Sequence, residues 1–124
     1  MSDHGYTVWK EFRFDAAHQL DAGEDGDPRY RRLHGHSYQV EVWVHGPLNE
    51  HGWVVDMGDL ASRIEHVREL LDHRYLNDVA GLGIPTMENI ARFVWEQLGD
   101  LPQLQRVAVK RAQNGEGCEY CGPA

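Results

Sequence analysis

The sequence predicts an α+β protein in which an antiparallel sheet is covered on one face by helices. Two observations support this class. Apolar residues alternate along segments near both ends of the chain, as in half-buried strands, and they recur at helical spacing in two central segments. The resulting order is strand, strand, helix, helix, strand, strand.

Two segments in the first half are predicted to be strands. Residues 6–15 and about 36–46 each place apolar side chains at every second position, so each strand has one apolar face. These positions are Val8, Phe12 and Phe14 in the first segment and Tyr38, Val40, Val42 and Val44 in the second. Residues 21–31 between them are rich in turn-forming residues and are predicted to form a loop.

The two central segments are predicted to be helices. Residues 59–71 follow a turn at 49–52 and carry apolar side chains at helical spacing, at positions 60, 64, 67 and 71. A second helix is expected to begin at Thr86, a favourable N-cap, with Glu88 in its first turn where the helix dipole favours an acid. Its apolar stripe consists of Ile90, Phe93, Val94 and Leu98.

The sheet is completed near the C-terminus. Residues 105–112 form a predicted strand with Val107 and Val109 on one face. Asn114-Gly115 is a hairpin signal that leads to a short last strand near 118–120.

Length and composition restrict the functional class. The 124 residues fit one domain, 1–124, and no apolar run approaches the ~20 residues that span a bilayer. The N-terminus has neither a basic nor an apolar segment, so we expect a cytoplasmic protein. A net charge of −8 argues against nucleic acid or anionic membranes as partners.

Three histidines form a candidate metal site. His34 and His36 lie two residues apart, so on a strand both point to the side of Tyr38 and Val40. His18 keeps the parity of Phe14, unless a bulge intervenes. Two neighbouring antiparallel strands could aim all three imidazoles at one point, and three such ligands with an open position describe a catalytic zinc site. A His-x-His pair also occurs without metal, and the residues alone leave both interpretations open.

Five segments together closely resemble the 6-pyruvoyl-tetrahydropterin synthase and 6-carboxy-tetrahydropterin synthase family, the latter serving queuosine biosynthesis. The resemblance covers about residues 6–121. The segments are Phe-Asp-Ala-Ala-His at 14–18, Leu-His-Gly-His-Ser at 33–37, Gly-Trp-Val-Val-Asp at 52–56, Leu-Asp-His-Arg-Tyr-Leu-Asn at 71–77 and Pro-Thr-Met-Glu-Asn at 85–89.

The resemblance implies a fold and an assembly. The family has the T-fold, two helices on a four-stranded antiparallel sheet. Three such sheets form a barrel, and two trimers stack as a homo-hexamer. This assembly would also cover the edges of the sheet, which an isolated chain leaves unpaired.

The resemblance also implies site residues. Zinc would be held by His18, His34 and His36, and the family substrate is dihydroneopterin triphosphate. Asp72 and His73 match the family's proton-shuttle pair, in which a carboxylate fixes the tautomer of an imidazole. Without the resemblance, a surface pair after a helix is the simpler interpretation of these two residues. The expected substrate-binding residues are Thr86, Glu88 and Arg111.

Two positions depart from the family pattern. The family's catalytic cysteine corresponds to Tyr30, and a phenol with an ordinary pKa near 10 is a poorer base than a thiol near 8.5. Neighbouring arginines or zinc could lower that value, or nearby acids could supply the base, namely Glu24, Asp25 and Asp27. The family's pterin-anchoring glutamate corresponds to Arg111, which only donates hydrogen bonds. Either the substrate differs, or Glu116 or Glu119 takes over as the anchor.

Three functional hypotheses follow. The first is a zinc-dependent lyase acting on a pterin. The second is a zinc enzyme of the same fold acting on a different, anionic substrate, and the third is a non-catalytic homologue that binds a ligand or metal. Cys118 and Cys121 form a single C-x-x-C, which is half a zinc site or simply two reduced thiols.

Overall fold

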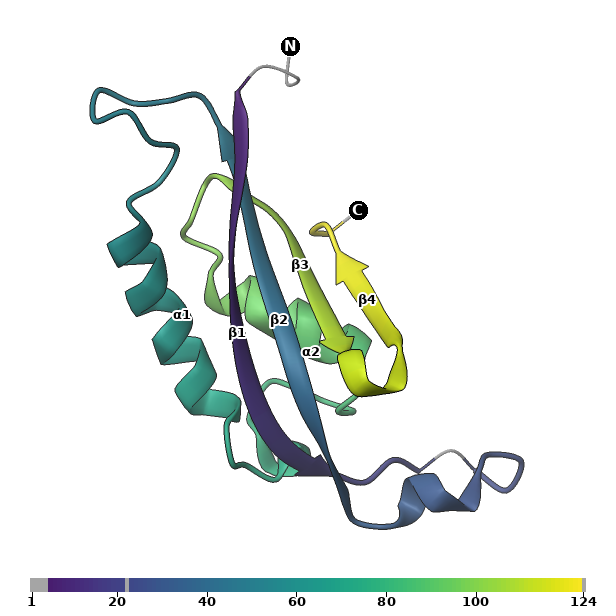
Figure 1. Ribbon diagram of the computed structural model, residues 1–124. Helices are drawn as coiled ribbons and strands as arrows, with labels where there is room; N and C mark the ends of the chain where they lie inside the picture. Colours follow the sequence, from purple (N-terminus) through teal and green to yellow (C-terminus); the bar gives the residue numbers. More distant parts are fainter. Residues whose placement is uncertain (1–4, 22, 124) are drawn as a thin grey trace.

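The computed structural model describes residues 5–21 and 23–123. It contains a four-stranded antiparallel meander in the order β1-β2-β3-β4. The strands are β1 (Tyr6–His18), β2 (His34–Gly46), β3 (Leu104–Arg111) and β4 (Glu116–Tyr120). The helices α1 (Met57–Leu71) and α2 (Met87–Gln97) lie between β2 and β3 in the chain and on one face of the sheet in space (Figure 1). The predicted α+β fold class is therefore confirmed.

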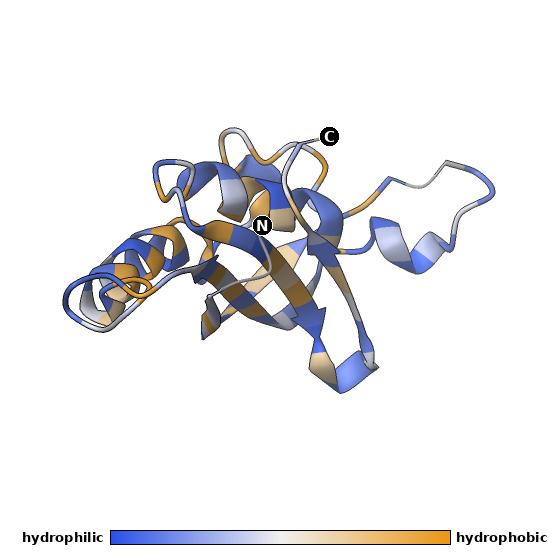
Figure 2. Cartoon of the chain, turned by 90° about the horizontal axis from the view of Figure 1, so that it is seen from above, coloured by the Kyte–Doolittle hydropathy of each residue, from blue (hydrophilic) through white to orange (hydrophobic). Residues whose placement is uncertain are grey.

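The core lies between this sheet face and the helices. Every predicted apolar position on α1 is buried, and α1 packs against β1 while α2 packs against β3 and β4. The inward row of β2 is almost fully buried, including Tyr38 and Val40. Apolar and polar residues alternate along the strands in Figure 2, as a sheet with one covered face requires.

The opposite face of the sheet carries aromatic and charged side chains. Trp9 of β1 stacks on Trp43 of β2 with ring centroids 4.7 Å apart, and the Arg106 guanidinium lies 4.1 Å above the Trp43 ring. No helix among the described residues covers this face. Within the same part of the chain, no helix is long and apolar enough to cross a membrane.

The element ends differ from the predicted ones where pairing or capping extends an element. β1 continues beyond residue 15 to His18, and β2 begins at His34, because the two strands stay paired without interruption up to His18 opposite His34. The first helix begins at Met57 instead of 59, since the Asp56 carboxylate caps it by accepting from the Gly58 and Asp59 backbone N–H groups.

Two connections between strands contain 3₁₀ turns. Pro28–Arg31 forms such a turn within the predicted loop 21–31, capped by Asp27. Ala112–Asn114 forms another between β3 and β4, so the third strand ends at Arg111 instead of 112. Gly115 closes the connection at φ +69°, a conformation that glycine adopts without steric cost.

Candidate functional site

Three imidazoles converge where β1 ends and β2 begins. His18 pairs with His34, and Ala16 pairs with His36, so the strand register places all three side chains on the covered side of the sheet. The Nε2 atoms of His18 and His34 are 2.9 Å apart. One ligand atom from each of the three histidines lies within 4.8 Å of the others. No bulge interrupts this part of the ladder, so His18 lies on the same side of the strand as Phe14, as the alternation in the sequence predicts.

Backbone carbonyls fix the tautomers of two of these rings. His18 Nδ1 lies 2.8 Å from the Pro85 carbonyl oxygen, and His34 Nδ1 lies 2.7 Å from that of Arg32. Since a carbonyl oxygen only accepts, both Nδ1 atoms carry a proton, so in the neutral form of each ring Nε2 presents the lone pair. Two lone pairs facing each other at 2.9 Å repel unless a cation lies between them.

Burial and charge keep two of the rings neutral. Burial lowers the pKa of His18, and burial followed by the positive charge of Arg111 lowers the pKa of His36 to about 4. Metals bind the neutral imidazole, so these histidines are in the ligating form at pH 7. Three imidazole nitrogens, on rings of which two are held by backbone acceptors, fit zinc as a protein-bound ion.

Arg111 lies against this histidine cluster. Its Nη1 is 3.2 Å from His36 Nε2, and its Nη2 is 2.5 Å from a Glu116 carboxylate oxygen. The side chain is therefore on the covered face, as its parity with Val107 and Val109 predicts. The neighbouring Lys110 points to the opposite face, where it pairs with Glu41.

Two clefts meet at His36 and Arg111. The first, here called the metal cleft, has a volume of about 790 Å³ and contains all three histidines. Five further predicted or alternative site residues line it: Tyr30, Thr86, Glu88, Arg111 and Glu116. The second, here called the shuttle cleft, has a volume of about 710 Å³ and is lined by His36, Arg111, Asp15 and His73. The fold thus gathers the expected substrate-binding residues around the histidines and places His73 across the second cleft.

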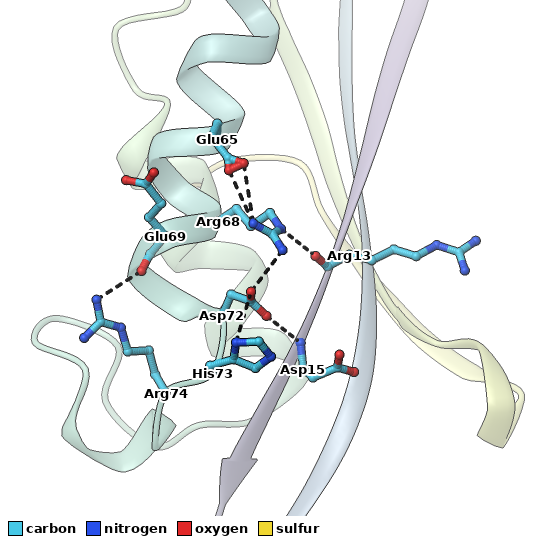
Figure 3. Close-up of polar contacts among 8 residues, drawn as sticks. All are labelled: Arg13, Asp15, Glu65, Arg68, Glu69, Asp72, His73 and Arg74. Atoms are coloured by element: carbon cyan, nitrogen blue, oxygen red, sulfur yellow. Dashed lines mark hydrogen bonds and ion pairs between the residues drawn. The ribbon is translucent and has the colours of Figure 1, made fainter.

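Asp72 and His73 follow α1 and lie beside β1 (Figure 3). The Asp72 carboxylate accepts from the Asp15 backbone N–H at 3.0 Å and from Arg68 Nη2 at 3.0 Å. The distance from Asp72 Oδ2 to His73 Nδ1 is 3.7 Å, longer than a hydrogen bond. Asp72 is thus primarily bound to Arg68 and to β1, and the two residues are adjacent without being hydrogen-bonded.

The backbone of His73 has an unusual conformation. Its φ is +58°, the one positive value among described non-glycine residues. Its N–H donates to the Asp15 carbonyl oxygen at 2.7 Å, while its side chain is 81% exposed. A positive φ is uncommon outside glycine, although histidine adopts it more often than most residues. When surrounding contacts maintain it, such a conformation is frequent at functional sites.

The alternative acids are not equivalent. Glu116 lines the metal cleft, whereas Glu119 lies 3.6 Å from Arg106 as its ion-pair partner. The Arg29 guanidinium hydrogen-bonds Asp27 and lowers the pKa of that carboxyl to about 2, which makes it a weak base. Glu24 lines a separate cleft with Gln19 and Asn77.

Tyr30 and the cysteines also have defined places. Tyr30 lies in the 3₁₀ turn and its side chain is partly exposed to the metal cleft. Thr86 caps α2 by accepting from the Asn89 N–H at 3.2 Å. Cys118 is half-buried, which raises the pKa of its thiol, and Cys121 is exposed. Among the described residues, neither cysteine joins a group of three metal-ligating side chains.

Three partners of the site residues were not predicted from the sequence. These are the Pro85 carbonyl that orients His18, the Arg68 side chain that holds Asp72, and Asp15, which contacts Asp72 through its backbone. Only Arg68 left a signal, because its spacing of four residues from Asp72 is that of an ion pair on a helix.

Comparison with known proteins agrees with this architecture. The family model for 6-pyruvoyl tetrahydropterin synthase matches residues 7–122. A 6-carboxy-5,6,7,8-tetrahydropterin synthase of Synechocystis sp. is 39% identical over 112 residues, which cover 84% of each chain. A dihydroneopterin monophosphate aldolase of Pyrococcus furiosus is 37% identical over 108 residues, 86% of each chain.

A solved structure shares the fold. The 6-pyruvoyl tetrahydropterin synthase of Caenorhabditis elegans superposes with a TM-score of 0.82 at 23% identity, covering 99% of both chains. With a family model that spans nearly all of the sequence and relatives above 30% identity, the chain belongs to the 6-pyruvoyl tetrahydropterin synthase family.

Proposed function

We propose that the protein is a zinc-dependent lyase that acts on a pterin such as dihydroneopterin triphosphate. The observation that carries the proposal is the convergence of one ring nitrogen from each of three histidines at the meeting point of two clefts. Family membership supports a reaction on a pterin side chain, since relatives act as tetrahydropterin synthases and one as an aldolase of dihydroneopterin monophosphate.

Each site residue has a role in this proposal. Zinc, held by His18, His34 and His36, would supply a Lewis acid that polarises oxygens of the substrate side chain. Thr86 and Glu88 bind the ring, with the Glu88 carboxylate accepting hydrogen bonds from ring N–H groups. His73 accepts a proton from the substrate at the side of the shuttle cleft and later returns it. Asp72 holds the backbone segment that carries His73.

Arg111 supports a second candidate, a zinc enzyme acting on a different, anionic substrate. A guanidinium opposite the donor edge of a pterin places donors against donors, whereas it can grip a carboxylate or phosphate with two parallel hydrogen bonds. Binding of a pterin to wild type and Arg111→Glu, compared by calorimetry, separates the two candidates. If the protein acts on a pterin and Arg111 does not contact that pterin, wild type and Arg111→Glu should bind the pterin with equal affinity.

We expect slow turnover of dihydroneopterin triphosphate, because Tyr30 stands where the family has a thiol. Ordinary pKa values near 10 and 8.5 make the basic form of a phenol about thirtyfold scarcer at pH 7. Tyr30→Cys should therefore raise the rate by about tenfold or more, and Tyr30→Phe should reduce it. Product formation is measured by liquid chromatography with mass detection, with dihydroneopterin monophosphate as a second substrate.

Two results would count against these roles. Wild-type turnover at rates usual for enzymes, on the order of 1–10³ per second, would show that the tyrosine is no handicap. An unchanged rate in Tyr30→Phe would remove Tyr30 from the reaction and leave an acid as the base.

We also propose a homo-hexamer made of two trimers. β1 and β4 are the two edges of the sheet, and no helix of the described chain covers the aromatic face formed by Trp9 and Trp43. Both features favour association with further copies. Light scattering coupled to size exclusion should give about six times the chain mass of 14.2 kDa. A monodisperse monomer would contradict this assembly.

A further inference from the structure

Arg111 places a positive charge directly beside a metal-ligating nitrogen. The 3.2 Å contact of its Nη1 is with His36 Nε2. Because a guanidinium only donates, Nε2 is the accepting nitrogen of this ring and therefore the one with a lone pair for a metal. Only 20% of the Arg111 side chain is exposed, so water screens this charge poorly. The arrangement is stable without metal, because the guanidinium donates to a nitrogen that accepts.

A bound cation changes the partners of Arg111. Once the His36 Nε2 lone pair is taken by a metal, the Nη1 N–H loses its acceptor. Nη2 remains with Glu116, and Nε is already buried without a hydrogen-bond partner. The guanidinium would then keep unsatisfied donors in a half-buried cleft next to a second positive charge, which is unfavourable on both grounds.

The charged side chains that line the metal cleft do not offset the positive charge that a bound metal adds. Three carboxylates and three guanidiniums line the cleft and cancel: Asp27, Glu88, Glu116, Arg29, Arg32 and Arg111. The three histidines are neutral as ligands, so a divalent cation adds two uncompensated positive charges. A neutral ligand would leave that excess in place.

We propose that the metal-loaded site takes an oxyanion group, a carboxylate or a phosphate, which Arg111 binds from the side of His36. The proposal rests on the metal site of the proposed function and adds the chemical class of the ligand group. An oxyanion supplies acceptors to the N–H groups that the metal leaves unpaired, and its charge lies between two cations. The substrate therefore carries an acidic group next to the atoms that react.

Glu116 competes with the incoming group for Arg111. Its carboxylate holds Nη2 at 2.5 Å, and 41% of its side chain is exposed, twice the fraction of Arg111. It also lines the metal cleft, where it repels an anion. Removing its charge as Glu116→Gln should therefore strengthen oxyanion binding, while removing the guanidinium as Arg111→Met should weaken it.

Cobalt-substituted protein provides a direct measurement. Cobalt(II) takes the place of zinc, and its visible absorption reports a change in coordination without turnover. Acetate and inorganic phosphate are titrated separately into wild type, Arg111→Met, Arg111→Lys and Glu116→Gln. The matched control is Lys110→Met, which removes the adjacent cation on the opposite face of the sheet.

We expect Arg111→Met to weaken binding of at least one of the two anions by about ten- to a hundredfold, the effect of a charged hydrogen bond. Arg111→Lys should be intermediate, Glu116→Gln tighter than wild type, and Lys110→Met unchanged. Arg111→Met should also bind cobalt more tightly, because a repulsive charge is removed. The anion that responds identifies the group as carboxylate or phosphate.

Anion affinities that are equal in wild type and in both Arg111 variants, with cobalt bound at the histidines, would overturn the inference and leave the proposed function intact. Absence of cobalt from the histidines in wild type would overturn both. If Arg111→Met does not fold, Arg111→Lys and Glu116→Gln decide the matter, because they must change affinity in opposite directions.

Discussion

Replacement of His34 by alanine is expected to remove zinc almost completely. The wild type should hold about one zinc per chain, and loss of one of three protein ligands should reduce affinity well beyond the ~10–100-fold cost of losing an outer-shell partner. His34 is a better test than His18, which is buried and donates to the Pro85 carbonyl, so its loss would also leave a cavity and an unpaired acceptor. Elemental analysis of the dialysed proteins gives the stoichiometry.

His66→Ala is the matched control for this substitution. His66 is an exposed histidine on α1, outside the groups that could hold a metal in the described chain. The control should keep full zinc content, and zinc should raise the melting temperature of wild type and control but not of His34→Ala. If His34→Ala retains full stoichiometry, the ligand assignment is wrong.

Asp72→Ala and His73→Asn are expected to separate stability from catalysis. Asp72 accepts two hydrogen bonds, one of them from a guanidinium, and its side chain is only 14% exposed. Its loss should lower the free energy of unfolding by about 1–3 kcal/mol and also reduce turnover. His73→Asn should leave stability nearly unchanged, since the ring is exposed and Asn tolerates the positive φ. It should reduce turnover by about 10²–10⁴-fold if the imidazole moves the proton.

Urea denaturation and dihydroneopterin triphosphate turnover are measured on the same preparations. A His73→Asn protein with wild-type turnover would exclude the imidazole as proton shuttle. An Asp72→Ala protein as stable as wild type would show that the contacts with Arg68 and Asp15 contribute nothing to the fold.

The periodicity of the sequence was sufficient to predict the sheet and to place the histidines. His18, His34 and His36 share a parity with buried core residues, and strand pairing without a bulge carries that parity to the strand ends. Arg111 was placed by the same rule. Each of these predictions depends only on the two-residue repeat of a strand.

Contacts between distant elements could not be predicted in this way. The Pro85 carbonyl reaches His18 from 67 residues away, and the Arg68 guanidinium reaches the Arg13 carbonyl of β1 from 55 residues away. The extension of β1 to His18 likewise results from its pairing with β2 and has no signal in residues 16–18 themselves. Tertiary packing decides such contacts, and local pattern does not.

A crystal structure of the zinc-loaded protein soaked with dihydroneopterin triphosphate, with data collected at the zinc absorption edge, tests the proposed function most directly. We expect one anomalous peak per chain, bonded to Nε2 of His18, His34 and His36 at roughly 2.0–2.1 Å. The pterin should lie in the metal cleft beside Glu88 and Thr86. Asp15, Asp72 and His73 form a second group whose possible ligand atoms lie within 4.8 Å of one another. An anomalous peak at this second group instead, or a metal cleft without pterin, would contradict the proposed function.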